Sequence, residues 1–394
     1  MLHFAFLASC FVIGRLTAAP SPTLEKAMPK DNSSARFQAN GLATLIGSLP
    51  VSDQREAFSL IFDHTPDIPL WPQLPGNPKE GMLNQFSEGI PGFVEEAGRT
   101  YFDIQTETFA EEMLAYFEQY LAALEDPNLL SDSPFAVSRE RAQGLFALQE
   151  AVAGKTVAAV KGQMTGPFTL LTGLHDREGR AAYYEPTIRE MVVKGLSLKA
   201  VWQVRLLAQA QAPVILFIDE PALAGLGSSA FLGVSLEELG QELNEVIGAA
   251  QAAGGLVGVH VCANTDWEFL LSTSLDIVSF DAYGFFDKLA ACKEAVFGFL
   301  GRGGIIAWGI VPTGEKEYIE QETAESLLAR WEAQAAQLVG GAWDYQALLR
   351  QTLITPSCGT GSLPLAHAKK VLALTRDLSK LLRDKYVTNH GVSP

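Results

Sequence analysis

The sequence predicts an α/β protein: a single-domain (β/α)8 barrel, the TIM-barrel fold. Eight apolar runs that favour strand structure are separated by Gly, Pro and polar residues. Most runs are followed by the periodicity of an amphipathic helix, and strands alternating with helices favour parallel β/α units. Eight such units are the number from which a TIM barrel is built.

The expected strands and helices alternate over most of the chain. The strands are expected at residues 42–47, 68–74, 157–163, 214–219, 256–261, 277–281, 304–311 and 353–357. The helices are expected at residues 109–124, 139–151, 186–210, 236–252, 324–338 and 365–385. A long interval separates strands two and three, and residues 85–92 within it predict an inserted loop or hairpin over one end of the barrel.

The composition is that of a globular protein, with 48% hydrophobic and 19% charged residues among 394. The formal net charge is -16 and no Lys/Arg-rich run occurs, which argues against a nucleic-acid or anionic-membrane partner. Four cysteines are too few for a disulfide framework in so long a chain. A metal site or a reactive thiol is the better interpretation of them.

The N-terminal residues 1–35 predict a leader, either disordered or a mis-assigned start, and residues 36–394 predict the barrel domain. The apolar run at residues 4–14 is too short to span a bilayer, and no Lys or Arg precedes it. It therefore lacks the charged beginning of an export signal. We favour translation from Met28 and a cytoplasmic protein, with an export signal as the alternative.

Polar side chains fall where the predicted strands end. The active site of a TIM barrel lies at the carboxyl ends of its strands. At these ends the sequence places Ser48, Asp219, His260, Cys262, Asp281 and Cys358. Caps on strand ends would not need two thiols and an imidazole, so this clustering predicts a functional site.

His260 and Cys262 are two residues apart at the end of the fifth expected strand. Side chains at this spacing share one face of a strand, about 7 Å apart at Cα, so both can reach one zinc ion. Cys358 follows the last expected strand and supplies a second thiol. The alternative for the first two residues alone is a buried cysteine beside a hydrogen-bonded histidine.

Five short segments resemble, in order, the C-terminal catalytic barrel of cobalamin-independent methionine synthase. More broadly they are similar to the zinc thiol-methyltransferases related to uroporphyrinogen decarboxylase. The resemblance runs from residue 45 to about residue 382 and implies a zinc-binding TIM barrel. The segments are Ile-Gly-Ser-Leu-Pro at 46–50, Lys-Gly-Gln-Met-Thr-Gly-Pro at 161–167, Asp-Glu-Pro-Ala-Leu at 219–223, His-Val-Cys at 260–262 and Pro-Ser-Cys-Gly at 356–359.

The resemblance implies roles in substrate binding. Ile46, Gly47 and Ser48 would hold the backbone of homocysteine, and Asp219 would bind its amino group. A strand-exit turn is the alternative for Asp219 without the resemblance. Glu88, in the inserted segment, is a second candidate partner for the ammonium group, and a solvated surface carboxylate is its alternative.

The resemblance also implies a metal site. His260, Cys262 and Cys358 match the family's zinc ligands. Asp281 stands where the family has its remaining ligand, a Glu, and is one methylene shorter. A helix cap is the alternative role for Asp281.

Three departures from the family concern the methyl donor. The sequence predicts one barrel, whereas the full-length family has a second barrel that helps bind polyglutamyl folate. Residues 170–174 lack the family's folate-side Asn-Trp-Ser, and residues 310–313 lack the His that protonates the folate leaving group. These departures predict a methylated corrinoid, free or on a corrinoid protein, rather than methyltetrahydrofolate.

The sequence therefore predicts a zinc-dependent S-methyltransferase that makes methionine from homocysteine, with Zn2+ as its cofactor. The nearest alternative is methyl transfer to another thiol such as coenzyme M. A uroporphyrinogen decarboxylase-like enzyme is a weaker alternative, because that chemistry uses no zinc. A non-catalytic barrel that binds zinc or a corrinoid is the alternative from a different class.

Overall fold

The computed structural model describes residues 37–96 and 99–387. The predicted leader, including Met28, lies outside the described residues. The described residues from Gln38 onward belong to one compact unit. Within the described part of the chain, no helix has the length and apolar character needed to cross a bilayer.

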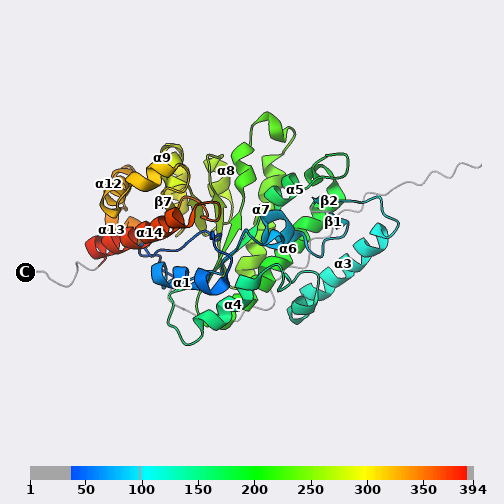
Figure 1. The fold of residues 1–394 in the computed structure, drawn as a ribbon. Helices are drawn as coiled ribbons and strands as arrows, with labels where there is room; N and C mark the ends of the chain where they lie inside the picture. Colours follow the sequence, from blue (N-terminus) through cyan, green and yellow to red (C-terminus); the bar gives the residue numbers. More distant parts are fainter. Residues whose placement is uncertain (1–36, 97–98, 388–394) are drawn as a thin grey trace, which may run out of the picture. The chain divides into compact units, whose positions relative to one another are not determined.

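A curled, six-stranded parallel sheet forms the centre of this unit, with helices packed along it (Figure 1). Each strand pairs with the next in the chain, as expected for successive β/α units. Every residue of β3, β4, β7 and β8 is buried. Burial on both faces explains the nearly continuous apolar runs of β4 and β7, whereas β3 also buries Lys161 and Gln163. The strands are β3 (Val160–Thr165), β4 (Val214–Asp219), β5 (Gly255–Val261), β6 (Ile277–Phe280), β7 (Ile305–Val311) and β8 (Thr352–Pro356).

The first two predicted strands are wrong as strands of the sheet. Residues 42–47 and 68–74 make only isolated parallel bridges: Ala43 with Ile354 of β8, Leu70 with Lys161 of β3, and Gln73 with Ser48, which directly follows the first segment. Prolines 69 and 72 in the second segment have no N–H to donate, which interrupts a hydrogen-bonded ladder. The described residues thus form six strands of a parallel β/α fold and not the eight strands predicted.

The helices follow the predicted alternation, with shifts of a few residues at their ends. All six predicted helices are present, as α3, α4, α6, α7, α12 and α14. The remaining helices have between 6 and 11 residues. In order they are α1 (Gln54–His64), α2 (Met82–Ser87), α3 (Phe109–Glu125), α4 (Gln143–Val152), α5 (Pro167–Gly173), α6 (Pro186–Leu207), α7 (Leu236–Ala252), α8 (Trp267–Ser272), α9 (Ala282–Ala291), α10 (Lys293–Gly301), α11 (Lys316–Gln321), α12 (Ala324–Ala335), α13 (Tyr345–Arg350) and α14 (Leu365–Tyr386).

The insertion predicted before β3 is present and contains a hairpin. Strands β1 (Phe93–Glu96) and β2 (Arg99–Phe102) pair antiparallel, between the short helix α2 and the long helix α3. The segment 85–92, which we expected to be the loop or hairpin itself, instead comprises the end of α2 and the turn into β1.

Candidate metal centre

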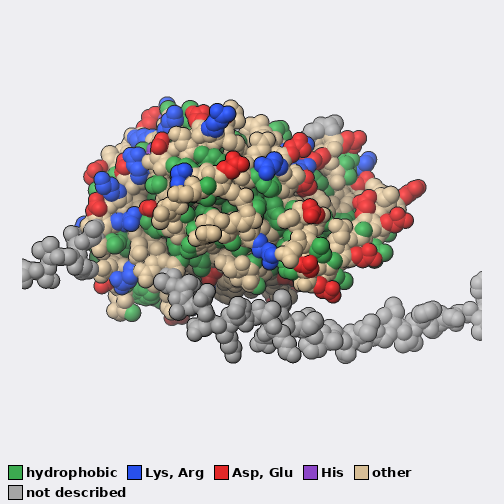
Figure 2. All heavy atoms as spheres, turned by 90° about the horizontal axis from the view of Figure 1, so that it is seen from below, with side chains coloured by type: hydrophobic (Ala, Val, Ile, Leu, Met, Phe, Trp, Pro, Cys, Tyr) green, Lys and Arg blue, Asp and Glu red, His purple; other side chains and the backbone are tan. Residues whose placement is uncertain are grey.

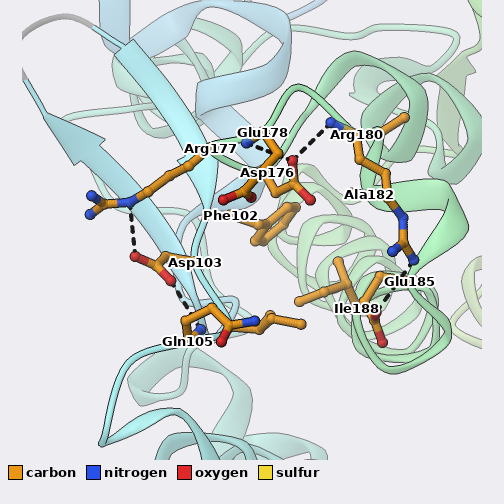
Figure 3. A pocket seen from close by; sticks show the side chains of 12 residues that line it. Phe102, Asp103, Gln105, Asp176, Arg177, Glu178, Arg180, Ala182, Glu185 and Ile188 are labelled. Carbon is orange, nitrogen blue, oxygen red and sulfur yellow. Dashed lines mark hydrogen bonds and ion pairs between the residues drawn. The ribbon is translucent and has the colours of Figure 1, made fainter.

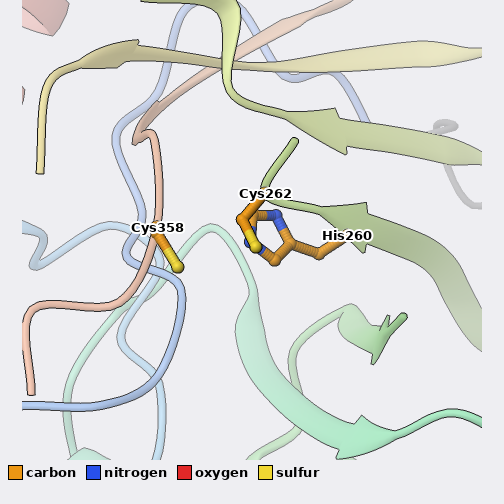
Figure 4. A group of neighbouring side chains, drawn as sticks. All are labelled: His260, Cys262 and Cys358. Atoms are coloured by element: carbon orange, nitrogen blue, oxygen red, sulfur yellow. The ribbon is translucent and has the colours of Figure 1, made fainter. Parts of the chain in front are cut away.

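An imidazole and two thiols converge at the carboxyl end of the sheet (Figure 4). His260 lies near the end of β5, Cys262 directly after it, and Cys358 two residues after β8. Their ligand atoms all lie within 4.8 Å of one another. No other group of three or more His, Cys, Asp or Glu side chains lies this close within residues 37–96 and 99–387.

The His260 ring is oriented by a neighbouring strand. His260 is paired with Ser279 in the sheet, and its Nδ1 lies 3.0 Å from Ser279 Oγ. The other ring nitrogen, Nε2, is buried and has no hydrogen-bond partner. Burial lowers the pKa of His260 to about 3, so the imidazole is neutral. A neutral histidine with one nitrogen hydrogen-bonded and the other unpartnered fits a metal ligand.

The two thiols interact with each other. The hydrogen bond with Cys358 lowers the pKa of Cys262 to about 7, although burial opposes this. The same hydrogen bond and burial raise the pKa of Cys358. Two thiolates and a neutral imidazole form a donor set that zinc prefers, and three protein ligands leave one position open for a substrate. The residues therefore fit a catalytic zinc ion.

Replacing Ser279 by Ala should weaken zinc binding. The hydroxyl is the partner that fixes the His260 ring, and removing such outer partners typically costs 10–100-fold in metal affinity, so we expect about that loss. Competition with a chromogenic chelator measures it. Ser279→Thr retains the hydroxyl and should retain most of the affinity; unchanged zinc affinity in Ser279→Ala would show that the bond does not orient the ligand.

Asp281 does not join the three ligands in the described structure. It is the N-cap of α9, where its Oδ1 accepts a hydrogen bond of 2.9 Å from the Gly284 amide. The group whose ligand atoms lie within 4.8 Å contains no carboxylate. Of the two roles expected from the sequence, the structure places Asp281 in the capping role, because its carboxylate is engaged at the start of the helix.

Replacing Asp281 by Asn should therefore leave one zinc per chain and an activity unchanged within about twofold, since Asn caps a helix as well as Asp. Metal analysis and a methyl-transfer assay check both values. Loss of zinc from the Asp281→Asn protein would show that Asp281 is a zinc ligand after all.

Asp219 ends β4 and is paired in the sheet with His260. Its side chain is buried, and Oδ1 has no hydrogen-bond partner. Burial raises the pKa of Asp219, while the positive charge of Lys161, in the neighbouring strand β3, acts to lower this pKa. An unpartnered buried carboxylate oxygen is costly unless a ligand satisfies it, so Asp219 is available for a cationic group.

The segment Ile46–Gly47–Ser48 lines a cavity together with Asp219 and His260, and two hydrogen bonds hold it in place. Lys161 Nζ donates to the Ile46 carbonyl at 2.6 Å. The Ser48 carbonyl accepts from the Thr360 amide at 3.0 Å, in the loop that follows Cys358. A Cβ on Gly47 would lie 2.7 Å from Gln73 Oε1, so a larger residue here would displace the Gln73 side chain.

These groups surround one cavity of about 400 Å³, a volume suited to an amino acid together with the reacting group of a second substrate. His260, Cys262, Cys358 and Asp219 all line it. The other lining residues come from the first two strand segments and the residues next to them, the insertion, the turn after β4 and the loop after β8: Ile46, Gly47, Ser48, Gln73, Pro75, Asn77, Pro78, Glu80, Gly81, Met82, Pro221, Gly359, Gly361 and Ser362.

Glu88 does not line this cavity, contrary to the sequence-based expectation. Its carboxylate lies 3.4 Å from Arg141 Nε and accepts a hydrogen bond of 2.9 Å from the Ser138 amide. These partners are in the insertion, and nothing in the local sequence around Glu88 indicates them. Glu88 therefore stabilises the insertion instead of facing the substrate.

Glu80 is the carboxylate of the insertion that does line the cavity, and its sequence context does not predict this. Only 4% of Glu80 is exposed, burial raises its pKa, and its Oε2 accepts from the Leu74 amide at 2.8 Å. In the sequence Pro-Lys-Glu-Gly it reads as a solvated turn residue. Its burial depends on the fold of the whole insertion, and no local signal reveals that.

A second cavity, of about 470 Å³, lies between β2 and the loop before α6 (Figure 3). Its two arginines are already engaged: Arg177 lies 3.0 Å from Asp103, and Arg180 lies 3.6 Å from Glu185. Asp176 accepts hydrogen bonds from two amides of its own turn. It offers no group of metal ligands, so the chemistry is assigned to the first cavity.

Comparisons with known proteins leave the family open. No family model matches the sequence, and no curated protein matches it. Among solved structures, the chain is similar to a B12-independent methionine synthase from Shewanella sp. W3-18-1 in complex with selenomethionine. The identity is 17%, over 61% of this chain and 67% of that chain, with a TM-score of 0.44.

Two further solved structures have other activities. A pneumococcal exo-beta-D-N-acetylglucosaminidase is 9% identical, over 86% of this chain and 85% of that chain, with a TM-score of 0.43. A dihydropteroate synthase from Stenotrophomonas maltophilia is 12% identical, over 68% and 89%, with a TM-score of 0.27. At such similarities the function has to be argued from the residues of this chain.

Proposed function

We propose that this protein is a zinc-dependent S-methyltransferase that methylates the sulfur of homocysteine to give methionine. One observation carries the proposal: the imidazole of His260 and the thiols of Cys262 and Cys358 converge within 4.8 Å on a cavity. The same cavity contains the unpartnered carboxylate oxygen of Asp219. A cation-binding carboxylate beside a zinc-type donor set suits a substrate with both an ammonium group and a thiol.

The acceptor thiol must lose its proton before it can attack. A free thiol with a pKa near 8.5 is mostly protonated at neutral pH. Zinc, when bound, would take the acceptor sulfur as a thiolate. Two cysteine thiolates and a neutral imidazole balance the charge of the ion, so an acceptor thiolate would keep much of its nucleophilicity.

The remaining residues position the acceptor. Asp219 would bind the ammonium group, and the backbone of Ile46–Gly47–Ser48 would hold the amino-acid end, with Lys161 and Thr360 fixing that segment. Holding the sulfur in line with the methyl carbon, at about 3–3.5 Å, supplies most of the rate increase that such a site can give.

The same proposal extends to the domain as a whole. We take residues 42–47 and 68–74 as reduced first and second strands of an eight-stranded barrel, because their bridges connect them to β8, to each other and to β3. Residues 36–394 would then be one barrel domain that resembles the C-terminal barrel of cobalamin-independent methionine synthase, and we expect it to act in the cytoplasm.

For the methyl donor we propose a methylated corrinoid, free or on a corrinoid protein. Departure of the folate nitrogen requires a proton, and general-acid help is commonly worth about 10²–10⁴ in rate. Residues 310–313, at the exit of β7, contain no histidine, and Thr313 there is hydrogen-bonded to Ser357 at 2.8 Å. A methylcobalt donor needs no such proton, because cobalt leaves with the electron pair of the broken bond.

The experiment is a methyl-transfer assay on the zinc-loaded protein with homocysteine and either methylcobalamin or methyltetrahydrofolate, mono- and polyglutamyl. We expect methionine with methylcobalamin and little with either folate. Brisk turnover with folate and none with methylcorrinoid, free or protein-bound, would overturn the donor assignment. Failure with every donor, together with no change at zinc on adding homocysteine, would overturn the activity itself.

Asp219 also favours homocysteine over coenzyme M as the acceptor thiol. Coenzyme M ends in a sulfonate and has no ammonium group, so the carboxylate would repel it.

A non-catalytic, purely structural zinc site would be closed by four protein ligands, whereas three converge in the described residues.

A further inference from the structure

Helix α3 presents an apolar stripe to solvent. Leu114 and Leu121 are each 60% exposed and Leu124 is 44% exposed. Phe117, between them, is partly exposed and also packs against the core. Their spacing alternates three and four residues, which is the a and d pattern of a coiled-coil seam. These four residues are called the α3 seam below.

The opposite face of α3 attaches the helix firmly to the domain. Tyr116 is 2% exposed, its hydroxyl donates to the Met191 carbonyl of α6 at 2.9 Å, and its ring lies 5.0 Å from that of Phe135. Ala123 is buried on the same side. The seam therefore faces outward on a helix that is already fixed in place, which keeps the entropic cost of binding low.

The side chains that flank the seam on one side are negatively charged. Glu111, Glu118 and Glu125 are exposed and repeat at the e position, directly beside the seam. Residues 100–138 contain no Lys or Arg, and their acidic residues are Asp103, Glu107, Glu111, Glu112, Glu118, Glu125, Asp126 and Asp132. Figure 2 shows acidic and apolar side chains together at the end of the molecule where Figure 1 places α3.

From this juxtaposition we propose that the α3 seam is the docking site for a basic amphipathic helix of a partner protein. Leucines of the partner would pack between Leu114, Phe117, Leu121 and Leu124, and its Lys or Arg would pair with the three e-position glutamates. A second copy of α3 is disfavoured as occupant, because its own glutamates would face these in an antiparallel pair. The helix has 17 residues, so the contact is short and suits a transient partner.

The test uses the full chain and two fluorescent helical peptides with leucine at a and d. One peptide has Lys at e and g, and the other has Glu there. We expect fluorescence anisotropy to show one-to-one binding of the Lys peptide, weakened about tenfold by added salt or by Glu111→Gln/Glu118→Gln/Glu125→Gln, and little binding of the Glu peptide. Leu114→Ser/Leu121→Ser should abolish binding while leaving the melting temperature and zinc content unchanged.

Leu232→Ser is the matched control, since Leu232 is 72% exposed but lies outside α3, and it should bind the Lys peptide normally. The proposal would be overturned by no binding of the Lys peptide, by equal binding of both peptides, or by equal binding to the Leu114→Ser/Leu121→Ser protein. Sedimentation that reveals a dimer dissociated by Leu114→Ser/Leu121→Ser would assign the seam to a second copy and also overturn it.

Discussion

Replacing Cys358 by Ser should leave the purified protein without stoichiometric zinc and without methyl transfer to homocysteine. Cys358 comes from the far end of the chain, and it is one of only two thiols in the group that it forms with His260 and Cys262. A serine hydroxyl does not ionise at neutral pH and is a poor zinc ligand, so we expect a loss larger than the roughly 10–100-fold caused by losing an outer partner. Cys262→Ser should behave in the same way.

The chain supplies a matched control for this experiment. Cys292 is a partly buried thiol between α9 and α10 and does not belong to the ligand group. Cys292→Ser should retain one zinc per chain and full activity, measured by inductively coupled plasma mass spectrometry and the methyl-transfer assay. Stoichiometric zinc in the Cys262→Ser/Cys358→Ser protein would place the metal elsewhere.

Replacing Asp219 by Asn should raise the KM for homocysteine while leaving the zinc content unchanged. The substitution preserves size but removes the charge that would bind the ammonium group in a buried position. Losing one partner of a buried charged pair costs roughly 2 kcal/mol or more, which corresponds to at least about a thirtyfold increase in KM.

The acceptor without its amino group, γ-mercaptobutyrate, separates this role from a structural one. Wild type should use it poorly, and Asp219→Asn should lose no further activity with it, since there is no ammonium to bind. Equal losses with homocysteine and γ-mercaptobutyrate would mean that Asp219 supports the site without contacting the amino group.

The sequence predicted the convergence of His260, Cys262 and Cys358 because the rule that governs it is simple. Parallel strands end at one edge of a sheet, so residues that follow different strands meet there. His260 and Cys262 share a strand face by their spacing, and Cys358 follows the last strand. The role of Asp281 was less predictable, since a carboxylate that follows a strand can either cap the next helix or bind a metal ion.

Other parts depend on contacts distant in sequence. Glu88 and Glu80 lie eight residues apart in the insertion, yet Arg141 and Ser138 engage Glu88 while Glu80 lines the cavity. Local sequence cannot distinguish two such carboxylates. The prediction of the first two strands was wrong for a different reason. Both segments have the apolar pattern of a strand, but the prolines of the second segment have no N–H to donate to a neighbouring strand.

X-ray absorption at the zinc edge, with and without homocysteine, tests the central claim most directly. The ligand group predicts two sulfur neighbours, at about 2.3 Å, in the zinc-loaded protein alone. Addition of homocysteine should bring the number of sulfur neighbours to three, whichever methyl donor the enzyme uses. A first shell that keeps two sulfurs after saturation with homocysteine would contradict activation of the acceptor at zinc.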